Sequence, residues 1–257
     1  MGKKGQLRFE EFGRTMPVTD PVVPGPPTWA QTELFRIDFE TEYDCVARRI
    51  PEPLEFLNDP PTGTILCSNA HFVSDTTPHM EANLIFHVSY HGKPYNYFAN
   101  LFVSQVEALI AGREVYGYPK KMAHMEFYKD SGQICMTVER PKGFRILSAS
   151  VRTQRPVQSR QEEPRDVLLL KVIPSPVIGE PPQVCQLVGI TRPPLPEGAE
   201  PPQSWECSGS ITWGVDSAED PWSGVKIKRI LSASYMAAPS GIPAPLASGY
   251  IVHDYLK

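Results

Sequence analysis

Proline limits how this chain can fold more than any other residue. The 257 residues include 28 prolines, many of them grouped in segments 21–27, 181–182, 193–202 and 239–245. Because proline has no backbone N–H and fixes φ, these segments cannot form regular helix and are predicted to be loops. The rest of the chain is thereby divided into short stretches.

Between the loops lie short runs rich in β-branched and aromatic residues, a composition typical of strands. Two segments depart from this pattern, residues 42–49 and 105–113, and the second places Val106, Leu109 and Ile110 on one helical face. Many strands with two short helices favour a mainly β (α+β) fold, an antiparallel β-barrel or curved sheet, over alternating βαβ units. The predicted strands are residues 34–39, 83–90, 96–103, 124–128, 134–139, 144–152, 167–173, 183–191, 205–213, 225–235 and 250–255.

The length and the net charge of the chain limit the classes of protein to which it can belong. A chain of 257 residues requires no more than one domain, so we expect a single domain over residues 1–257 with an N-terminal arm at residues 1–34. The net charge of −4, with basic and acidic residues interspersed, argues against a nucleic-acid partner. No apolar run is long enough for a membrane span and no signal-peptide apolar region is present, which predicts a cytoplasmic protein.

Cysteine and histidine give no sign of a metal site. The five cysteines are odd in number and far apart, without a CxxC pair, and are expected to be buried thiols in a reducing compartment. His87 and His91 are four residues apart, but they lie on or beside a predicted strand, where that spacing does not bring two rings together. We therefore expect neither a metal nor another cofactor.

A large barrel or curved sheet has a chemical consequence for lysine. Inward-facing positions of such strands can enclose a ligand cavity with apolar walls. A lysine that projects into this cavity loses hydration of its ammonium form, so the free amine becomes available near neutral pH.

The segment that carries the most chemical information is residues 112–121, Gly-Arg-Glu-Val-Tyr-Gly-Tyr-Pro-Lys-Lys. Its two lysines follow a proline that fixes the backbone. A solvated basic pair is the ordinary interpretation of two adjacent lysines. Here the pair lies between aromatic residues, Tyr116 and Tyr118, and an apolar strand start, Met122 and Ala123, which favours a partly enclosed site.

This segment resembles the signature of acetoacetate decarboxylase and its relatives, a Gly-Arg-Glu followed by an aromatic residue, proline and two lysines. Further landmarks match at compatible spacing: Pro-Glu-Pro-Leu-Glu at 51–55, Leu-Leu-Lys-Val-Ile-Pro at 169–174 and Asp-Tyr-Leu-Lys at 254–257. The resemblance runs from about Phe35 to the C-terminus. It implies the acetoacetate decarboxylase-like fold for this chain.

The resemblance also implies roles for individual residues. In the family the first lysine forms a protonated imine with the substrate ketone and the second lies beside it, which assigns Lys120 as the nucleophile and Lys121 as a residue that disfavours its ammonium form. Glu81 falls at a catalytic glutamate of the decarboxylases and could act as general acid or base; a surface acid is the alternative. Tyr116 is expected to line the substrate site or tune the amine.

Three departures from the decarboxylases stand out. Their second pocket glutamate has no counterpart in residues 66–74, and their Arg-Glu pair before the first strand reads Thr32-Glu33 here. Tyr250 stands where they have an acidic residue, and could exchange a proton with a substrate hydroxyl or simply pack in a core or interface.

These departures favour the branch of the superfamily that does not decarboxylate. We expect a Schiff-base lyase for 2-oxo acids, a pyruvate aldolase-dehydratase or hydratase, with Arg113 as an anchor for the substrate carboxylate or as a salt-bridge partner of a glutamate. A β-keto acid decarboxylase of the acetoacetate type and a non-catalytic small-ligand barrel are the alternatives. The expected partners are a small keto acid and further copies of the chain, as a dimer or tetramer.

Overall fold

The computed structural model describes residues 4–22, 29–73, 77–157, 165–191, 200–238 and 249–257. It contains two short α-helices, α1 (Tyr43–Val46) and α2 (Val106–Ala111), a π-helical turn η3 (Gly112–Tyr116) and short 3₁₀ turns η1 (Phe9–Glu11), η2 (Ala47–Arg49) and η4 (Trp222–Gly224). None of the helices that it describes has the length and apolar character needed to span a membrane.

The strands are β1 (Trp29–Glu40), β2 (Glu55–Phe56), β3 (Thr62–Val73), β4 (His79–Tyr90), β5 (Lys93–Val103), β6 (Lys120–Met122), β7 (His124–Asp130), β8 (Gln133–Glu139), β9 (Arg145–Val157), β10 (Asp166–Ile173), β11 (Val184–Ile190), β12 (Gln203–Trp213), β13 (Arg229–Ala238) and β14 (Gly249–Asp254).

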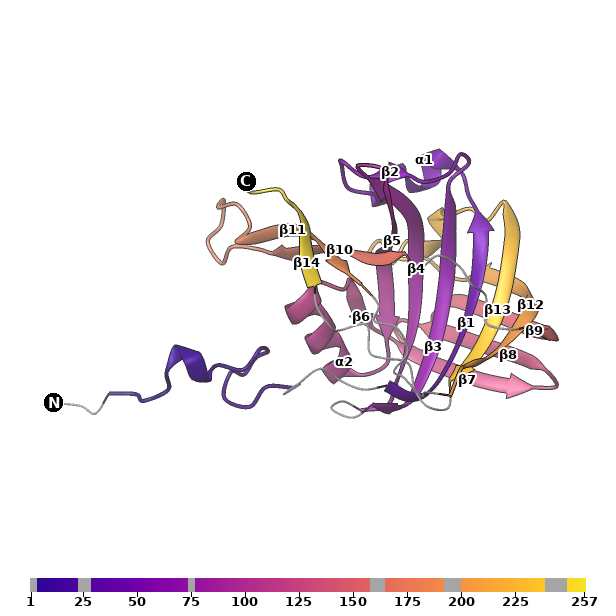
Figure 1. Ribbon diagram of the computed structural model, residues 1–257, viewed down its shortest axis with the longest axis horizontal. Coiled ribbons are helices and arrows are strands. Elements are labelled where there is room, and N and C mark those ends of the chain that lie inside the picture. The colour runs from indigo at the N-terminus through magenta and orange to yellow at the C-terminus, as the bar shows by residue number, and fades with distance from the viewer. Residues whose placement is uncertain (1–3, 23–28, 74–76, 158–164, 192–199, 239–248) are drawn as a thin grey trace.

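The strands form one large curved sheet, as Figure 1 shows. Its order is β14-β11-β10-β5-β4-β3-β1-β13-β12-β9-β8-β7, and over the described residues the two ends of this path do not pair, so the sheet does not close into a barrel. The mainly β, curved-sheet prediction is confirmed, but the sheet is mixed rather than purely antiparallel. β6 and β10 each run parallel to β5. Parallel neighbours need a crossover connection, and α2 and η3 provide it between β5 and β6.

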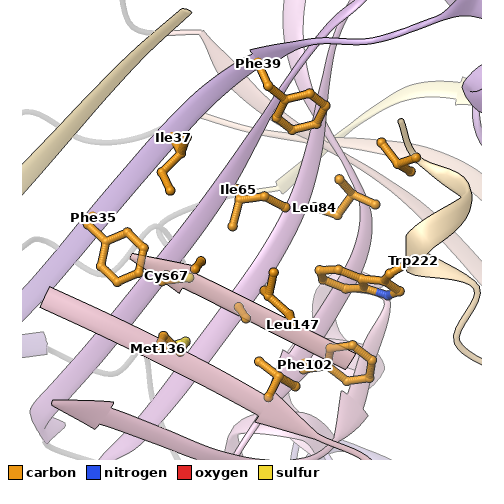
Figure 2. Close-up of a cluster of buried hydrophobic side chains, with 14 of the residues drawn as sticks. Phe35, Ile37, Phe39, Ile65, Cys67, Leu84, Phe102, Met136, Leu147 and Trp222 are labelled. Carbon is orange, nitrogen blue, oxygen red and sulfur yellow. The ribbon is translucent and has the colours of Figure 1, made fainter. Parts of the chain in front are cut away.

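Strand β4 separates two apolar clusters because its side chains alternate between the two faces. Ala82, Leu84 and Phe86 belong to the larger cluster, shown in Figure 2, which lies between the central strands and β7–β9. There Phe102 stacks on Trp222 with ring centroids 4.9 Å apart.

The second cluster covers the opposite face of β4 and β5, on the side of α2, β10 and β11 (Figure 1). It contains Ile85 of β4 and Leu101 and Val103 of β5, packed against Ala108 of α2 and the aromatic ring of Tyr118. A short helix therefore lies over the end of the sheet, and the segment that follows it re-enters the sheet as β6.

Three sequence predictions need correction. Strand β3 was not among the predicted strands, because polar and small residues such as Ser68 and Asn69 interrupt its apolar alternation. Strand β1 begins at Trp29, inside the segment expected to be an arm. The two helices are shorter than predicted, since 3₁₀ and π turns replace their last residues.

Candidate active site

The π-helical turn η3 sets the direction in which the chain approaches β6. The backbone N–H of Gly117 donates to the carbonyls of Gly112 and Arg113, 3.0 and 3.2 Å away. Gly117 then takes φ +88°, a left-handed conformation that glycine adopts without steric cost. Pro119 is the centre of a tight turn in which the Lys120 N–H donates to the Tyr118 carbonyl at 2.7 Å, and β6 begins at Lys120. Turns of the π type are frequent at functional sites.

Gly112 allows the Lys120 side chain to lie directly against the helix. A Cβ at position 112 would be 2.6 Å from Lys120 Cε and 2.8 Å from its Cδ, closer than atoms approach without displacement. Gly112 has an ordinary helical φ of −65°, so the glycine serves the close approach rather than the backbone conformation. The Gly-Arg-Glu of the motif therefore shapes the space that the lysine occupies.

The Lys120 amine is held by two acceptors in a buried position. The residue is 7% exposed, and its Nζ donates to Glu81 Oε1 at 2.6 Å and to the carbonyl oxygen of Ala108 at 3.0 Å. The ring of Tyr118 lies 5.4 Å from Nζ, within the range of a cation–π contact. The structure thus brings together Lys120 and Glu81, which are 39 residues apart in sequence.

Glu81 is the carboxylate of this pair. Burial acts to raise its pKa, but the positive charge of Lys120, the nearby His79 and the hydrogen bond from Lys120 outweigh burial, and the pKa lies below its ordinary value. Glu81 is therefore ionised at neutral pH and forms an ion pair with the Lys120 ammonium. His79, 4% exposed, places Nε2 at 3.7 Å from the same Glu81 oxygen.

Lys121 faces away from Lys120, which corrects the expectation that its charge lies beside the amine. Successive residues of a strand point to opposite faces, and Lys121 pairs in register with Phe102 of the larger cluster, whereas Lys120 pairs with Leu101. The Lys121 ammonium donates to Asp220 Oδ1 at 2.9 Å and also to the backbone oxygen of Glu219. Its contacts are those of an ion pair on the other side of the sheet.

Tyr116 and Arg113 lie at different distances from the amine. Tyr116 is buried and packs edge-on against Tyr118, with ring centroids 6.5 Å apart, so it supports the ring that faces Lys120. Arg113 is an exposed residue of η3. The hydrogen-bond acceptors of the Lys120 amine are Glu81 and Ala108, and the predicted roles of Tyr116 and Arg113 in substrate binding stay predictions.

The structure does not bring Tyr250 together with Lys120. The Tyr250 hydroxyl donates to Asp166 Oδ2 at 2.5 Å and accepts from Lys93 at 3.0 Å. Burial and then the Asp166 hydrogen bond raise the pKa of Tyr250 to about 12. Asp166 pairs with Tyr95 near the start of β5, whereas Lys120 pairs with Leu101 near its end. At the rise of a strand these two points are about 20 Å apart.

The resemblance implies further charged groups of the decarboxylases at Thr32-Glu33 and in the segment 66–74, which fall on β1 and, up to Val73, on β3. Thr32 of β1 is buried. Leu66 of β3 is half-buried, pairs in register with Asn83 and packs against the second cluster. Leu66 and Ile85 also line an open cavity of about 800 Å³ over β1, β3 and β13, and neither Lys120 nor Glu81 is among its lining residues. This cavity adjoins the amine's face of the sheet without containing the amine.

Sequence reasoning missed His79 and Tyr118, which the fold places around the amine. A signal for His79 was available, because residues two apart on a strand share a face and His79 precedes Glu81 by two. Tyr118 could only be placed once the π turn was known. Over the described residues, no cluster of three or more His, Cys, Asp or Glu side chains is positioned to bind a metal ion.

The contact between Lys120 and Glu81 suits one reaction, the addition of an amine to a carbonyl group. An amine in contact with an ionised carboxylate has a base at 2.6 Å that can take its proton. The deprotonated amine can then add to a carbonyl carbon, and apolar side chains on the same face limit the access of water. These are the requirements for forming an imine with a ketone.

Comparisons with known proteins identify the family of this chain. Residues 15–256 match the family model described as acetoacetate decarboxylase (ADC), a match that begins well before the Phe35 expected from the motifs. The acetoacetate decarboxylase of Clostridium botulinum is 26% identical over 251 residues, covering 95% of this chain and 96% of that protein.

Two solved structures have the same fold. One, from structural studies of acetoacetate decarboxylase, is 23% identical, covers 98% of this chain and all of the other, and superposes with a TM-score of 0.84. The enduracididine biosynthesis enzyme MppR, complexed with the condensation product of pyruvate and imidazole 4-carboxaldehyde, is 19% identical, covers 99% of this chain and all of the other, and has a TM-score of 0.73. The match over residues 15–256 shows that the chain belongs to the acetoacetate decarboxylase family.

Proposed function

We propose that this protein is a Schiff-base decarboxylase of a small β-keto acid, with Lys120 as the amine that attacks the ketone. The observation that carries the proposal is the 2.6 Å contact between the Lys120 amine and the Glu81 carboxylate, beside an apolar cluster. Full-length similarity to a protein named acetoacetate decarboxylase supports loss of CO₂ in preference to an aldol reaction, the opposite of the order favoured from sequence.

The change in charge during decarboxylation suits this setting. The imine of a β-keto acid carries a cationic nitrogen and a carboxylate, and loss of CO₂ converts both into neutral products. Because charges disappear on the way to the transition state, a site with few polar groups favours the reaction. Leu101, Val103 and Ala108 supply such an environment around the Lys120–Glu81 pair.

Glu81 would accept and donate the protons that are transferred during the reaction. It takes a proton from the Lys120 ammonium, the free amine adds to the ketone, and the proton returns to the carbinolamine hydroxyl, which leaves as water. After CO₂ departs, the enamine carbon takes up one proton, and hydrolysis of the resulting imine releases the ketone. Each turnover therefore consumes one proton.

An aldolase-dehydratase that acts on pyruvate is the second candidate. It is favoured by the absence of any Asp or Glu in β3 and by Thr32 in β1, where the decarboxylases have further charged groups. Against it, the hydroxyl of Tyr250, assigned from sequence as the proton donor for dehydration, is bound to Asp166 and Lys93 elsewhere in the fold.

The test compares the two reactions in one preparation. CO₂ release is followed with acetoacetate, and ultraviolet absorbance of a conjugated 2-oxo acid is followed with pyruvate and an aromatic aldehyde. We expect CO₂ release that Lys120→Ala abolishes and Lys121→Ala leaves largely intact. Conjugated product without CO₂ release would favour the second candidate over this proposal. If the protein shows neither activity and borohydride traps no imine, both candidates are wrong.

A further inference from the structure

A second titratable side chain faces Glu81 from its own strand. His79 lies two residues before Glu81 on β4, so both point to the same face. Its Nε2 is 3.7 Å from Glu81 Oε1, the same oxygen that accepts from Lys120 at 2.6 Å. One carboxylate oxygen thus lies between an amine and an imidazole.

The backbone of Thr77 determines which ring nitrogen can exchange a proton with Glu81. His79 Nδ1 is 3.0 Å from the Thr77 carbonyl oxygen. A carbonyl oxygen only accepts hydrogen bonds, so Nδ1 carries the hydrogen in this contact, and in the neutral ring the lone pair is on Nε2. The nitrogen that faces Glu81 is therefore the one that can take up and release a proton.

Burial, more than the neighbouring charges, disfavours the protonated form of His79. Two charged groups face the ring, Glu81 from β4 and Lys120 from β6. Burial lowers the pKa of His79, Glu81 opposes this, and Lys120 acts in the direction of burial, with a net pKa below the ordinary value. The ring is buried, but Thr77 and Pro78, directly before it, are exposed. The chain therefore reaches the protein surface directly before His79.

We propose that His79 is a positioning residue that resupplies Glu81 with the proton that each turnover consumes. This inference rests on the proposed function. The keto-acid anion plus one proton gives the ketone and CO₂, and the enamine carbon takes that proton from protonated Glu81. His79, protonated from water, then returns a proton from Nε2 to the Glu81 carboxylate and becomes neutral again. His79 acts through Glu81 and does not contact the substrate.

Loss of His79 should affect the first turnover less than those that follow. Imine formation and the first loss of CO₂ require no net proton uptake, whereas release of the ketone does. In His79→Gln we expect borohydride trapping within about twofold of the wild type, a rapid burst of about one CO₂ per chain, and a steady rate lower by about 10–100-fold, the range of a lost proton-transfer group. His79→Phe should behave in the same way.

A matched control exists in the same chain. His124 and Glu126 form a second His-x-Glu pair on a strand, also with Nε2 and Oε1 3.7 Å apart, but on β7 with more than a third of each side chain exposed. His124→Gln should leave both burst and steady rate unchanged. A steady rate in His79→Gln equal to that of the wild type would overturn the proposal. Equal losses of trapping and steady rate would also overturn it, because they indicate a structural role.

Proton exchange distinguishes failure of this inference from failure of the proposed function. Acetone in D₂O should exchange its methyl protons through the imine and enamine, which needs proton transfer but no loss of CO₂. Exchange that is fast in the wild type and at least about tenfold slower in His79→Gln supports the role of His79 even if no β-keto acid is decarboxylated. Equal exchange in both proteins would contradict it.

The wild-type protein provides a test that needs no variant. ¹⁵N NMR of histidine-labelled protein should find His79 neutral with the hydrogen on Nδ1 at pH 7. An Nε2–H tautomer would overturn the proposal, because Nδ1 would then be the nitrogen that takes up a proton and Nε2, which faces Glu81, could not receive one from water.

Discussion

Two adjacent lysines have different tasks because a strand presents its side chains to alternate faces. Lys120 contacts Glu81 beside the second cluster, and Lys121 contacts Asp220 at the edge of the first. Asp220 is 1% exposed and also binds Arg140 at 2.5 Å, so it depends on both cations. The two lysines of the motif thus differ in their contacts, and in the proposed function only Lys120 reacts.

This division predicts the outcome of Lys121→Ala. Removal of one of the two cations around a buried carboxylate should lower the free energy of unfolding by about 1–3 kcal/mol. Imine formation should stay within about threefold of the wild type, because the amine keeps Glu81 and Ala108. Urea unfolding and borohydride trapping measure the two effects. Lost trapping in a protein of unchanged stability would mean that Lys121 acts on the amine.

At the scale of the element, the site depends on how α2 ends. The helix passes into a π turn, Gly117 adopts a left-handed conformation, and the chain re-enters the sheet at Lys120. The lysine side chain lies against this turn at Gly112, where its amine reaches the carbonyl of Ala108. The helix end positions the amine, while β4 supplies the carboxylate.

Gly112→Ala should slow imine formation without lowering the free energy of unfolding. Alanine has the better helix propensity and position 112 has helical dihedral angles, so folding should be unaffected or slightly stabilised. The new Cβ would lie 2.6 Å from Lys120 Cε, so the amine must move and imine formation should fall at least about tenfold.

The matched control is Gly224→Ala. At this position a Cβ would meet its nearest atom, in Arg49, at an ordinary 3.4 Å. Its effect on imine formation should be negligible. Trapping in Gly112→Ala at the wild-type rate would show that the close approach has no bearing on the amine.

At the scale of the whole molecule, buried polar contacts join strands that are distant in sequence. Asp38 of β1 accepts from Thr64 of β3 at 2.6 Å and from Ser232 of β13 at 2.7 Å. Burial acts to raise the pKa of Asp38, but Arg36 and the two hydroxyl donors outweigh it, and the pKa lies below its ordinary value. Three neighbouring strands of the curved sheet meet at this carboxylate.

The lowered pKa of Asp38 gives stability a defined pH dependence. A carboxyl whose folded-state pKa is depressed stabilises the fold fully above its unfolded value, and this contribution is lost as pH falls through the folded value. Asp38→Asn should therefore lower the free energy of unfolding by about 1–3 kcal/mol at pH 7, and the difference should shrink in acid. Urea unfolding at several pH values measures it; a constant difference would contradict the assigned charge.

Local patterns predicted the fold class, and the resemblance to the decarboxylases placed Lys120 and Glu81 in one site, but neither predicted the geometry between the two side chains. Proline loops and β-branched runs are local signals, and so is the motif that contains Lys120. The place of β3 in the sheet and the face on which the Lys121 side chain lies depend on strand register. A sequence specifies register only through contacts with distant strands. Tyr250 was assigned because it stands where the decarboxylases have an acidic residue, and only the pairing of β10 with β5 shows where its hydroxyl lies.

In the proposed reaction, Lys120 forms an imine from which CO₂ is lost. The most direct test of this step is intact mass and peptide mapping of the protein after treatment with acetoacetate and borohydride. Decarboxylation before reduction would leave one isopropyl group per chain on Lys120, since the trapped species is then the imine of acetone. A label that retains the carboxylate, or an isopropyl group on any other lysine, would contradict the account.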